Sequence, residues 1–204
     1  MNPHRTMARF VAIVLFATAS FALPACGNSN NTTGTTTVVA VFSPDTASPA
    51  DGSITLLPGS TSGAAVNVRV TVTQVASFFG AAFRIQYDAT ALLFNGMDNS
   101  SSFLRTGVTD PNQLYFSADS ANSPGEIVIT ATRLFPAVPV LLVATTSDLV
   151  ILNFVARKAI APGTAAGRLD FGDPTQNQVC DGTVVGTGCG PITATWKGGG
   201  VSAQ

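Results

Sequence analysis

The segment Ala65-Val66-Asn67-Val68-Arg69-Val70-Thr71-Val72 decides the fold class, because valine occupies every second position in it. Successive side chains of a β-strand point to opposite faces of the sheet, so a period of two predicts a strand with one apolar face. The residues predicted to be buried are Val66, Val68, Val70 and Val72. The residues predicted to face outward are Asn67, Arg69, Thr71 and Thr73.

The next predicted strand, 79–87, shows the same alternation and ends at a turn residue. Its inward side chains are Phe83, Ile85 and Tyr87, and its outward side chains are Arg84 and Gln86. The following residue, Asp88, can cap the turn with its carboxylate.

Short apolar runs of the same kind recur along the rest of the chain, and Pro, Gly, Asp or Asn separate them. The other predicted strands are 38–42, 53–57, 92–97, 114–118, 126–134, 149–156, 167–171 and 192–196. Strands of this length with turn signals at roughly ten-residue spacing indicate an all-β protein with a single β-sandwich. The sequence shows no convincing amphipathic helix and no internal repeat.

The composition excludes several classes of function. Charged residues make up 10% of the chain and the net charge is -1, so there is no electrostatic case for a nucleic-acid partner. The only histidine is His4, which excludes nucleophilic catalysis with a histidine base in the domain. We therefore predict no catalytic residues, no metal and no cofactor.

Most aspartates fall in turn contexts, where capping is the expected role. The alternatives are a carboxylate pair for glycoside hydrolysis and a Ca²⁺ site with oxygen ligands from Asp170, Asp173 and Asp181.

The N-terminus resembles a bacterial lipoprotein signal. Basic residues precede an apolar run, and the run ends in Leu23-Pro24-Ala25-Cys26, which is similar to a lipobox except for Pro24. The resemblance implies that Cys26 is lipidated and that residues 1–25 are a signal peptide. The Gly-, Asn- and Thr-rich residues 26–37 should form a flexible tether, and residues 38–204 the folded domain. The alternative is an ordinary cleaved signal.

The number of cysteines supports lipidation. An exported protein with three cysteines has one that cannot pair within the chain, and lipidation accounts for it. Lipidation of Cys26 leaves Cys180 and Cys189, which lie close in sequence between glycines and can close a short disulfide loop. We therefore expect an exported protein attached to the cell envelope, at the outer membrane or cell surface, through the lipid alone.

Several segments, in order, resemble a cohesin domain. They are Val66 to Val72, Phe83-Arg84-Ile85-Gln86-Tyr87-Asp88 with Leu92-Leu93-Phe94, Ser102-Phe103-Leu104, Leu149 to Ala156, Ala161-Pro162-Gly163 and Leu169-Asp170-Phe171. The resemblance implies a jelly-roll sandwich of about nine strands. It also implies a non-catalytic module that binds a protein partner, dockerin-like or another envelope protein, and a link to polysaccharide breakdown.

The partner-binding face that the resemblance implies comprises Arg84, Gln86, Thr130, Thr132 and Arg133. Gly80, Ala81 and Ala82 depart from the family pattern, because dockerin-binding cohesins carry polar contact residues there. A carbohydrate-binding module is the alternative, with polysaccharide as its ligand. It would need an exposed aromatic residue. The candidates are Trp196, Phe78, Phe79 and Phe135, for each of which a core position is the competing interpretation.

Substitution of Cys26→Ser should release the protein from membranes or block its processing. Stable anchoring takes more than one acyl chain, and a lipidated N-terminal cysteine supplies them. Mass spectrometry of the mature N-terminus checks this prediction. An unmodified cysteine, or cleavage at another position, would contradict it.

Overall fold

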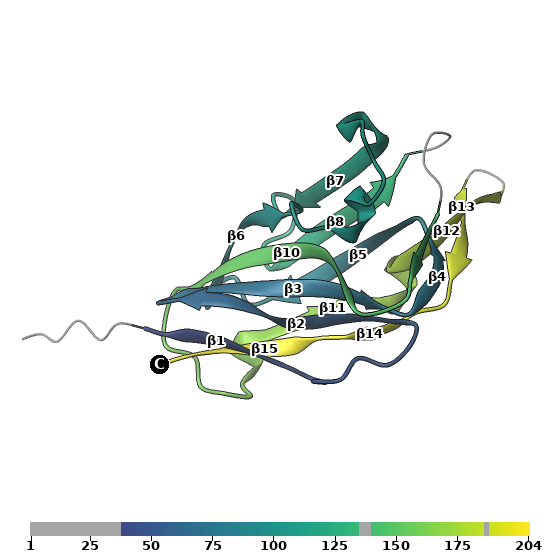
Figure 1. The fold of residues 1–204 in the computed structure, drawn as a ribbon. Helices are drawn as coiled ribbons and strands as arrows, with labels where there is room; N and C mark the ends of the chain where they lie inside the picture. Colours follow the sequence, from purple (N-terminus) through teal and green to yellow (C-terminus); the bar gives the residue numbers. More distant parts are fainter. Residues whose placement is uncertain (1–37, 135–139, 186–187) are drawn as a thin grey trace, which may run out of the picture. The chain divides into compact units, whose positions relative to one another are not determined.

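Two layers of β-sheet make up the computed structural model, which describes residues 38–134, 140–185 and 188–204 (Figure 1). The predicted signal peptide, Cys26 and the predicted tether lie outside the described residues. Among the described residues, no helix has the length and apolar character that crossing a membrane requires.

The larger sheet contains eight strands and is organised around β5 (Gly80–Tyr87). One edge of β5 pairs with β8, which in turn pairs with β7. The other edge pairs first with β12 and then with β11, and β11 leads through β15 to β1. The remaining strands of this sheet are β1 (Ala40–Pro44), β7 (Leu114–Asp119), β8 (Glu126–Arg133), β11 (Arg168–Phe171), β12 (Gln178–Val185), β13 (Gly188–Ile192) and β15 (Gly199–Ala203).

The smaller sheet contains five strands in the order β14-β2-β3-β10-β6. They are β2 (Ser53–Ser62), β3 (Ala65–Thr73), β6 (Leu92–Asp98), β10 (Ser147–Ala156) and β14 (Thr195–Lys197). A separate pair consists of β4 (Val75–Phe78) and β9 (Leu141–Val143). Four single-turn 3-10 helices complete the described elements: η1 (Phe103–Arg105), η2 (Pro111–Gln113), η3 (Ala165–Gly167) and η4 (Pro174–Gln176).

The core lies between the two sheets and is built by the predicted period of two. Val66, Val68, Val70 and Val72 of β3 are completely buried, as are Phe83 and Ile85 of β5. Aromatic rings join the layers, because Phe154 of β10 packs against Tyr87 of β5 with 5.6 Å between ring centroids. The prediction of a single all-β sandwich is therefore confirmed.

The outward face of β3 differs from the prediction in part. Thr71 and Thr73, predicted to be exposed, are buried. The Thr71 hydroxyl donates a hydrogen bond of 3.0 Å to the carbonyl oxygen of Thr55, which satisfies the buried group.

The number of strands exceeds the nine that the resemblance implies. The sequence did not predict β4, β9, β12 and β15, and it predicted a single strand at 192–196, where β13 ends and β14 begins. Glycines obscured β15, which begins in a run of three glycines. The predicted end of β2 at Pro58 is also wrong, since β2 continues to Ser62 with an irregular register between Pro58 and Thr61. The partner strand β14 pairs only with the first residues of β2, so Pro58 lies where β2 is an edge strand and proline is tolerated.

Arg133 lies on the inner face of β8, which corrects its predicted place on the exposed face. Ile127, Ile129, Ala131 and Arg133 alternate with exposed or half-buried residues, and Arg133 is 1% exposed. The error was to group Arg133 with Thr130 and Thr132, from which the period of two separates it.

The guanidinium of Arg133 binds backbone oxygens of the segment between β6 and β7. Its Nε and Nη2 donate to the Leu104 carbonyl oxygen at 3.1 and 2.9 Å, and Nη2 also donates to the carbonyl oxygen of Thr106. Burial lowers the pKa of Arg133 from its usual value. The side chain thus fixes the η1 segment against the end of β8.

Two adjacent glycines of β15 provide a test of the packing at the edge of the larger sheet. A Cβ atom at Gly199 would collide with the Phe42 ring and lie 2.7 Å from the carbonyl oxygen of Ser43. The nearest atom to a Cβ at Gly200 would be 3.8 Å away, on the backbone of Gly167. Gly199→Ala should lower the free energy of unfolding by about 1–3 kcal/mol through overpacking. Gly200→Ala should change it by no more than about 1 kcal/mol. Urea denaturation measures the free energy of unfolding of both variants. If the two substitutions lowered it equally, Phe42 would not pack against Gly199 as the structure shows.

Replacing Arg133 with leucine keeps much of the side chain's volume and removes every donor. Arg133→Leu should lower the free energy of unfolding by about 2–3 kcal/mol, because the buried carbonyl oxygen of Leu104 loses the guanidinium that donates to it. The matched control is Arg84→Leu, which removes a partly exposed ion pair worth less than about 1 kcal/mol. Denaturation of the two variants in urea should therefore separate them clearly. If Arg133→Leu were as stable as Arg84→Leu, the role assigned to the buried guanidinium would be wrong.

Candidate functional site

The outer face of β5, β8 and β7 brings four of the five predicted binding residues together. The ladder register pairs Arg84 with Val128 and Gln86 with Glu126, while Thr130 pairs with Ala82 on one side and Ser117 on the other. Paired residues share a face of the sheet. We call this surface the β5–β8–β7 face; its outward residues are Ala82, Arg84, Gln86, Glu126, Val128, Thr130, Thr132, Tyr115, Ser117 and Asp119.

Small side chains make the centre of the face flat. Gly80 pairs with Thr132, and Ala82 pairs with Thr130. A Cβ atom at Gly80 would collide with the Thr132 hydroxyl and lie 2.9 Å from the Thr132 Cα, so the backbones there need glycine. The departure from the family pattern therefore has a structural reason at Gly80, which is the close approach of Thr132 on β8.

Two exposed apolar side chains border this flat centre, and sequence analysis did not single them out. Tyr115 of β7 is 50% exposed, and Val128 of β8 is 38% exposed. The alternation in 114–118 and 126–134 contains the signal, because Val128 is out of phase with the buried residues of β8 and Tyr115 stands between the half-buried Leu114 and Phe116 of β7. An amphipathic tyrosine beside small residues is a typical anchor of protein interfaces.

Arg84 supplies the main positive charge of the face and is held in place. Its guanidinium forms an ion pair with Glu126, and the two side chains are 34% and 20% exposed. The backbone N–H of Arg84 donates a 3.0 Å hydrogen bond to the side-chain oxygen of Asn177, next to η4. The charged group thus remains accessible while its backbone is fixed.

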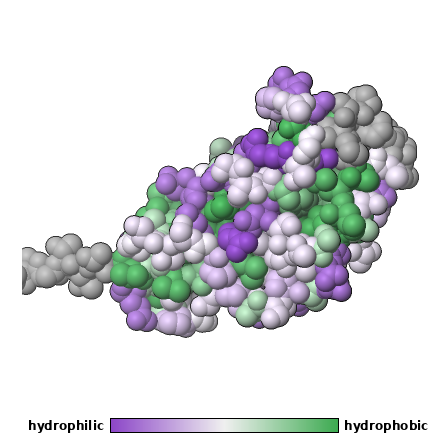
Figure 2. Space-filling view, in the orientation of Figure 1, coloured by the Kyte–Doolittle hydropathy of each residue, from purple (hydrophilic) through white to green (hydrophobic). Residues whose placement is uncertain are grey.

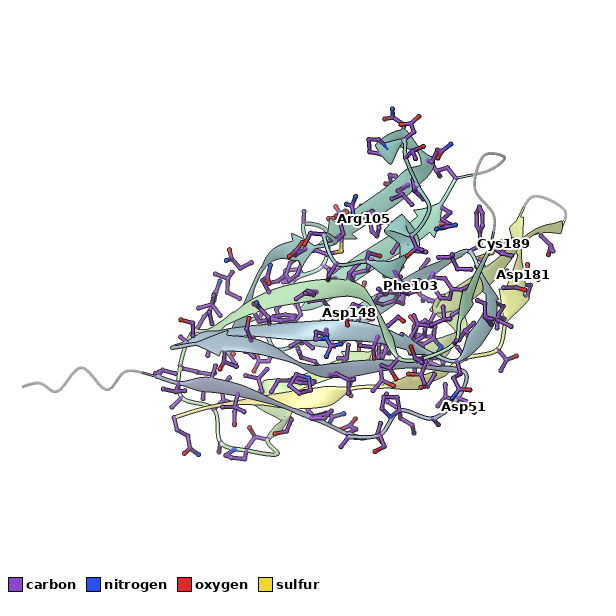
Figure 3. All side chains as sticks on the ribbon, in the orientation of Figure 1. Asp51, Phe103, Arg105, Asp148, Asp181 and Cys189 are labelled. Carbon is purple, nitrogen blue, oxygen red and sulfur yellow. A yellow bond between two sulfur atoms is a disulfide. The ribbon has the colours of Figure 1, made fainter. Side chains whose placement is uncertain are left out.

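The predicted disulfide between Cys180 and Cys189 is present and lies beside the face. It joins β12 to β13, and Figure 3 shows Cys189 close to Asp181 in this hairpin. Cys180 pairs with Gly80, the first residue of β5, so the crosslinked hairpin continues the sheet beyond that strand. Disulfides persist in oxidising compartments, so this bond fits an exported protein.

Six aspartates cap turns, as predicted. In each case one carboxylate oxygen accepts the backbone N–H of the residue two positions later, at 2.8–2.9 Å. They are Asp88, Asp98, Asp110, Asp119, Asp173 and Asp181. Hydrogen bonds from Thr90 lower the pKa of Asp88, and those from Thr175 lower the pKa of Asp173. The six carboxylates thus serve the backbone of their own turns, and the lowered pKa of Asp88 and Asp173 is opposite to the raised pKa that a general acid requires.

Asp170 does not join Asp173 and Asp181 in a cation site. Asp170 pairs with Arg168, while Asp173 and Asp181 each cap their own turn. Within the described ranges, no group of three histidine, cysteine or acidic side chains is close enough to hold a metal ion.

The aromatic candidates are mostly core residues. Phe78 is completely buried and Phe79 nearly so, which confirms the core interpretation for both. Phe135 lies outside the described residues. Trp196 is partly buried and packs against Phe171 and Phe83, with 5.0 and 5.7 Å between ring centroids. Figure 2 shows that the visible face of the domain mixes hydrophilic, intermediate and hydrophobic residues.

The solved structures that are similar to this chain include cohesins at low sequence identity. The sixth cohesin of scaffoldin B from Acetivibrio cellulolyticus, solved with a mutant Cel5 dockerin, is 21% identical over 79% of this chain and 96% of that chain, with a TM-score of 0.49. A cohesin from Clostridium thermocellum, solved as a cohesin–dockerin complex, is 17% identical over 68% and 83%, with a TM-score of 0.45. The cohesin module of a family 33 glycoside hydrolase from Clostridium perfringens is 16% identical over 79% and 99%, with a TM-score of 0.41.

A search of curated proteins gives no match. The family model described as "Cohesin domain" matches residues 53–187, about two thirds of the 204 residues. The match begins with β2 and includes all the strands of the β5–β8–β7 face. The chain therefore belongs to the cohesin domain family, whose members are non-catalytic protein-binding modules.

Proposed function

We propose that the domain binds a protein partner through the β5–β8–β7 face and so attaches that partner to the cell envelope. The observation that carries the proposal is the composition of this face. Its centre consists of small side chains, and Tyr115, Val128 and the Arg84–Glu126 pair surround the centre. A flat patch bordered by an exposed aromatic residue and an arginine has the anatomy of a protein interface.

The partner that fits this surface is a dockerin-like module or another envelope protein. Gly80 and Ala82 offer no hydrogen-bonding side chains, so at the centre a partner can bond only to the hydroxyls of Thr130 and Ser117, and charge at the rim adds specificity. Arg84 can donate to a carboxylate of the partner in exchange for Glu126, and Tyr115 can bury its ring while its hydroxyl stays near water. The expected partner therefore carries a small apolar patch with an acidic group beside it.

Attachment to the envelope rests on the N-terminal sequence. A lipid on Cys26 and the polar residues 26–37 would hold the domain at the membrane surface while leaving it free to turn. Because the chain resembles cohesins, the partner that it attaches should be a protein that takes part in polysaccharide breakdown. The disulfide supports export, because such bonds persist outside the cytosol.

The test is capture of proteins from native envelope extract by the immobilised full chain, followed by affinity measurement with the captured partner. Arg84→Ala and Tyr115→Ala should each weaken binding about tenfold or more, because arginine and tyrosine dominate interface energetics. Arg69→Ala is the matched control. Arg69 forms an equivalent ion pair with Asp148 on the outer face of the smaller sheet, and the exposures of the two side chains, 36% and 19%, are nearly the same as those of Arg84 and Glu126.

Thermal denaturation of the three variants accompanies the binding measurement, because each partly exposed pair contributes less than about 1 kcal/mol to stability. Unchanged melting temperatures with selective loss of binding in Arg84→Ala and Tyr115→Ala support the proposal. Equal affinity for wild type and both face variants, or an equal loss in Arg69→Ala, would place the interface elsewhere and refute it.

A further inference from the structure

A polar hollow with an aromatic wall opens at the sandwich edge, between β11 and β14. Its volume is about 400 Å³, and the residues that supply side-chain chemistry are Asp45, Asp170, Phe171, Asn177, Trp196 and Lys197. They come from the end of β1, from β11, from the segment after η4 and from β14. The β5–β8–β7 face does not contain Trp196 or Lys197, so this hollow is a separate feature.

Trp196 forms the aromatic wall and its orientation is fixed. Its ring packs against Phe171 at 5.0 Å and against Phe83 at 5.7 Å between centroids, so inner-face aromatics hold it from the core side. Within the described part of the chain, the indole N–H of Trp196 makes no hydrogen bond. Every side-chain polar atom there that is buried has a hydrogen-bond partner, so an indole N–H without one is not buried. The indole N–H is therefore open to solvent and available to a ligand.

Two carboxylates are held at the hollow by one arginine. Arg168 Nη1 and Nη2 donate to the two carboxylate oxygens of Asp45 at 2.6 and 3.0 Å, and Nε donates to Asp170 Oδ2 at 3.2 Å. The carboxylates remain 38% and 46% exposed. The hydrogen bonds from Arg168 lower the pKa of Asp45, so this acceptor stays ionised at every pH near neutrality. The hollow thus presents fixed hydrogen-bond acceptors beside an aromatic ring.

The charges around the hollow cancel. Asp45 and Asp170 are negative, and Arg168 and Lys197 are positive, so the hollow favours neither an anion nor a cation. A neutral ligand that stacks on an aromatic ring and exchanges several hydrogen bonds fits these groups. A pyranose has an apolar C–H face and a rim of hydroxyls that both donate and accept.

We propose that this hollow binds a neutral sugar residue of a glycan. The sugar ring lies against Trp196, its hydroxyls donate to Asp45 and Asp170, and Lys197 and the indole N–H donate to its oxygens. An aromatic wall with a few convergent polar groups is the usual constitution of a small-ligand site. The proposal does not depend on the protein-binding function, because the two surfaces use different residues.

The sole tryptophan of the chain makes the experiment specific, since Trp196 is the only source of indole fluorescence. The full chain is titrated with neutral tetrasaccharides of glucose, xylose, mannose and N-acetylglucosamine. At least one should give a saturable change in emission with a Kd below about 10 mM, as expected for a shallow site. Tetragalacturonate, the charged comparison, should bind no more tightly than the best neutral probe at low salt. Affinity should be constant between about pH 5 and about pH 8, because Asp45 does not titrate there.

Variants separate this site from the protein-binding face. Calorimetry with the best probe should show Kd raised about fivefold or more by Trp196→Phe, which retains an aromatic ring but loses the indole N–H. Lys197→Gln should weaken binding, whereas Lys158→Gln, an exposed lysine outside the hollow, should not. Arg84→Ala should leave sugar affinity unchanged. The proposal is overturned if no neutral probe alters the emission up to about 10 mM, or if Trp196→Phe and Lys197→Gln bind the probe like wild type.

Discussion

The packing of β5 and β8 against the valine face of β3 is the constraint on which the rest of the structure depends. Val68 and Val70 on one sheet and Phe83 and Ile129 on the other are fully buried, so the two inner faces have only one compatible register. A slip of one residue in β5 would bring Arg84 into the core and Phe83 to the surface. The same alternation that builds the core thus determines which side chains are available to a partner.

Two groups next to the β5–β8–β7 face hold its strands in place: the buried Arg133 and the disulfide of the β12–β13 hairpin. Arg133 ends the inner side of β8 and binds the carbonyl oxygens of the η1 segment, where Phe103 also packs against Phe78 with 5.1 Å between ring centroids. On the opposite edge of β5, the disulfide holds the β12–β13 hairpin beside Gly80. Two groups outside the face therefore support it, one at the end of β8 and one beside the first residue of β5.

Sequence periodicity predicted the sandwich, its valine core and the outward position of Arg84 and Gln86, because those segments alternate without interruption. The prediction is wrong for Arg133. Its charge favours an exposed position, but the alternation along β8 places it with the buried residues. The side chain is long enough to reach backbone oxygens from an inner position, and nothing local in the sequence reveals that partner.

Non-local contacts also explain the other omissions. The strand β15 begins with Gly199, which is required because the Phe42 ring packs against it, and that contact joins the two ends of the domain. The hollow at Trp196 combines Asp45, which follows β1, with residues of β11 and β14, and these segments are distant in sequence. Single-sequence analysis could identify Trp196 as a candidate but could not supply the carboxylates that Arg168 places beside it.

The central claim is that the outer face of the larger sheet, and not that of the smaller sheet, receives the partner. The most direct measurement places one bulky charge on each face and compares capture of the partner. Thr130→Arg changes a residue at the centre of the β5–β8–β7 face, and Asn153→Arg changes a residue of β10 in the smaller sheet. The structure predicts that Thr130→Arg abolishes capture while Asn153→Arg retains it, with both variants folded by circular dichroism. Retained capture by Thr130→Arg, or equal loss in the two variants, would contradict the account.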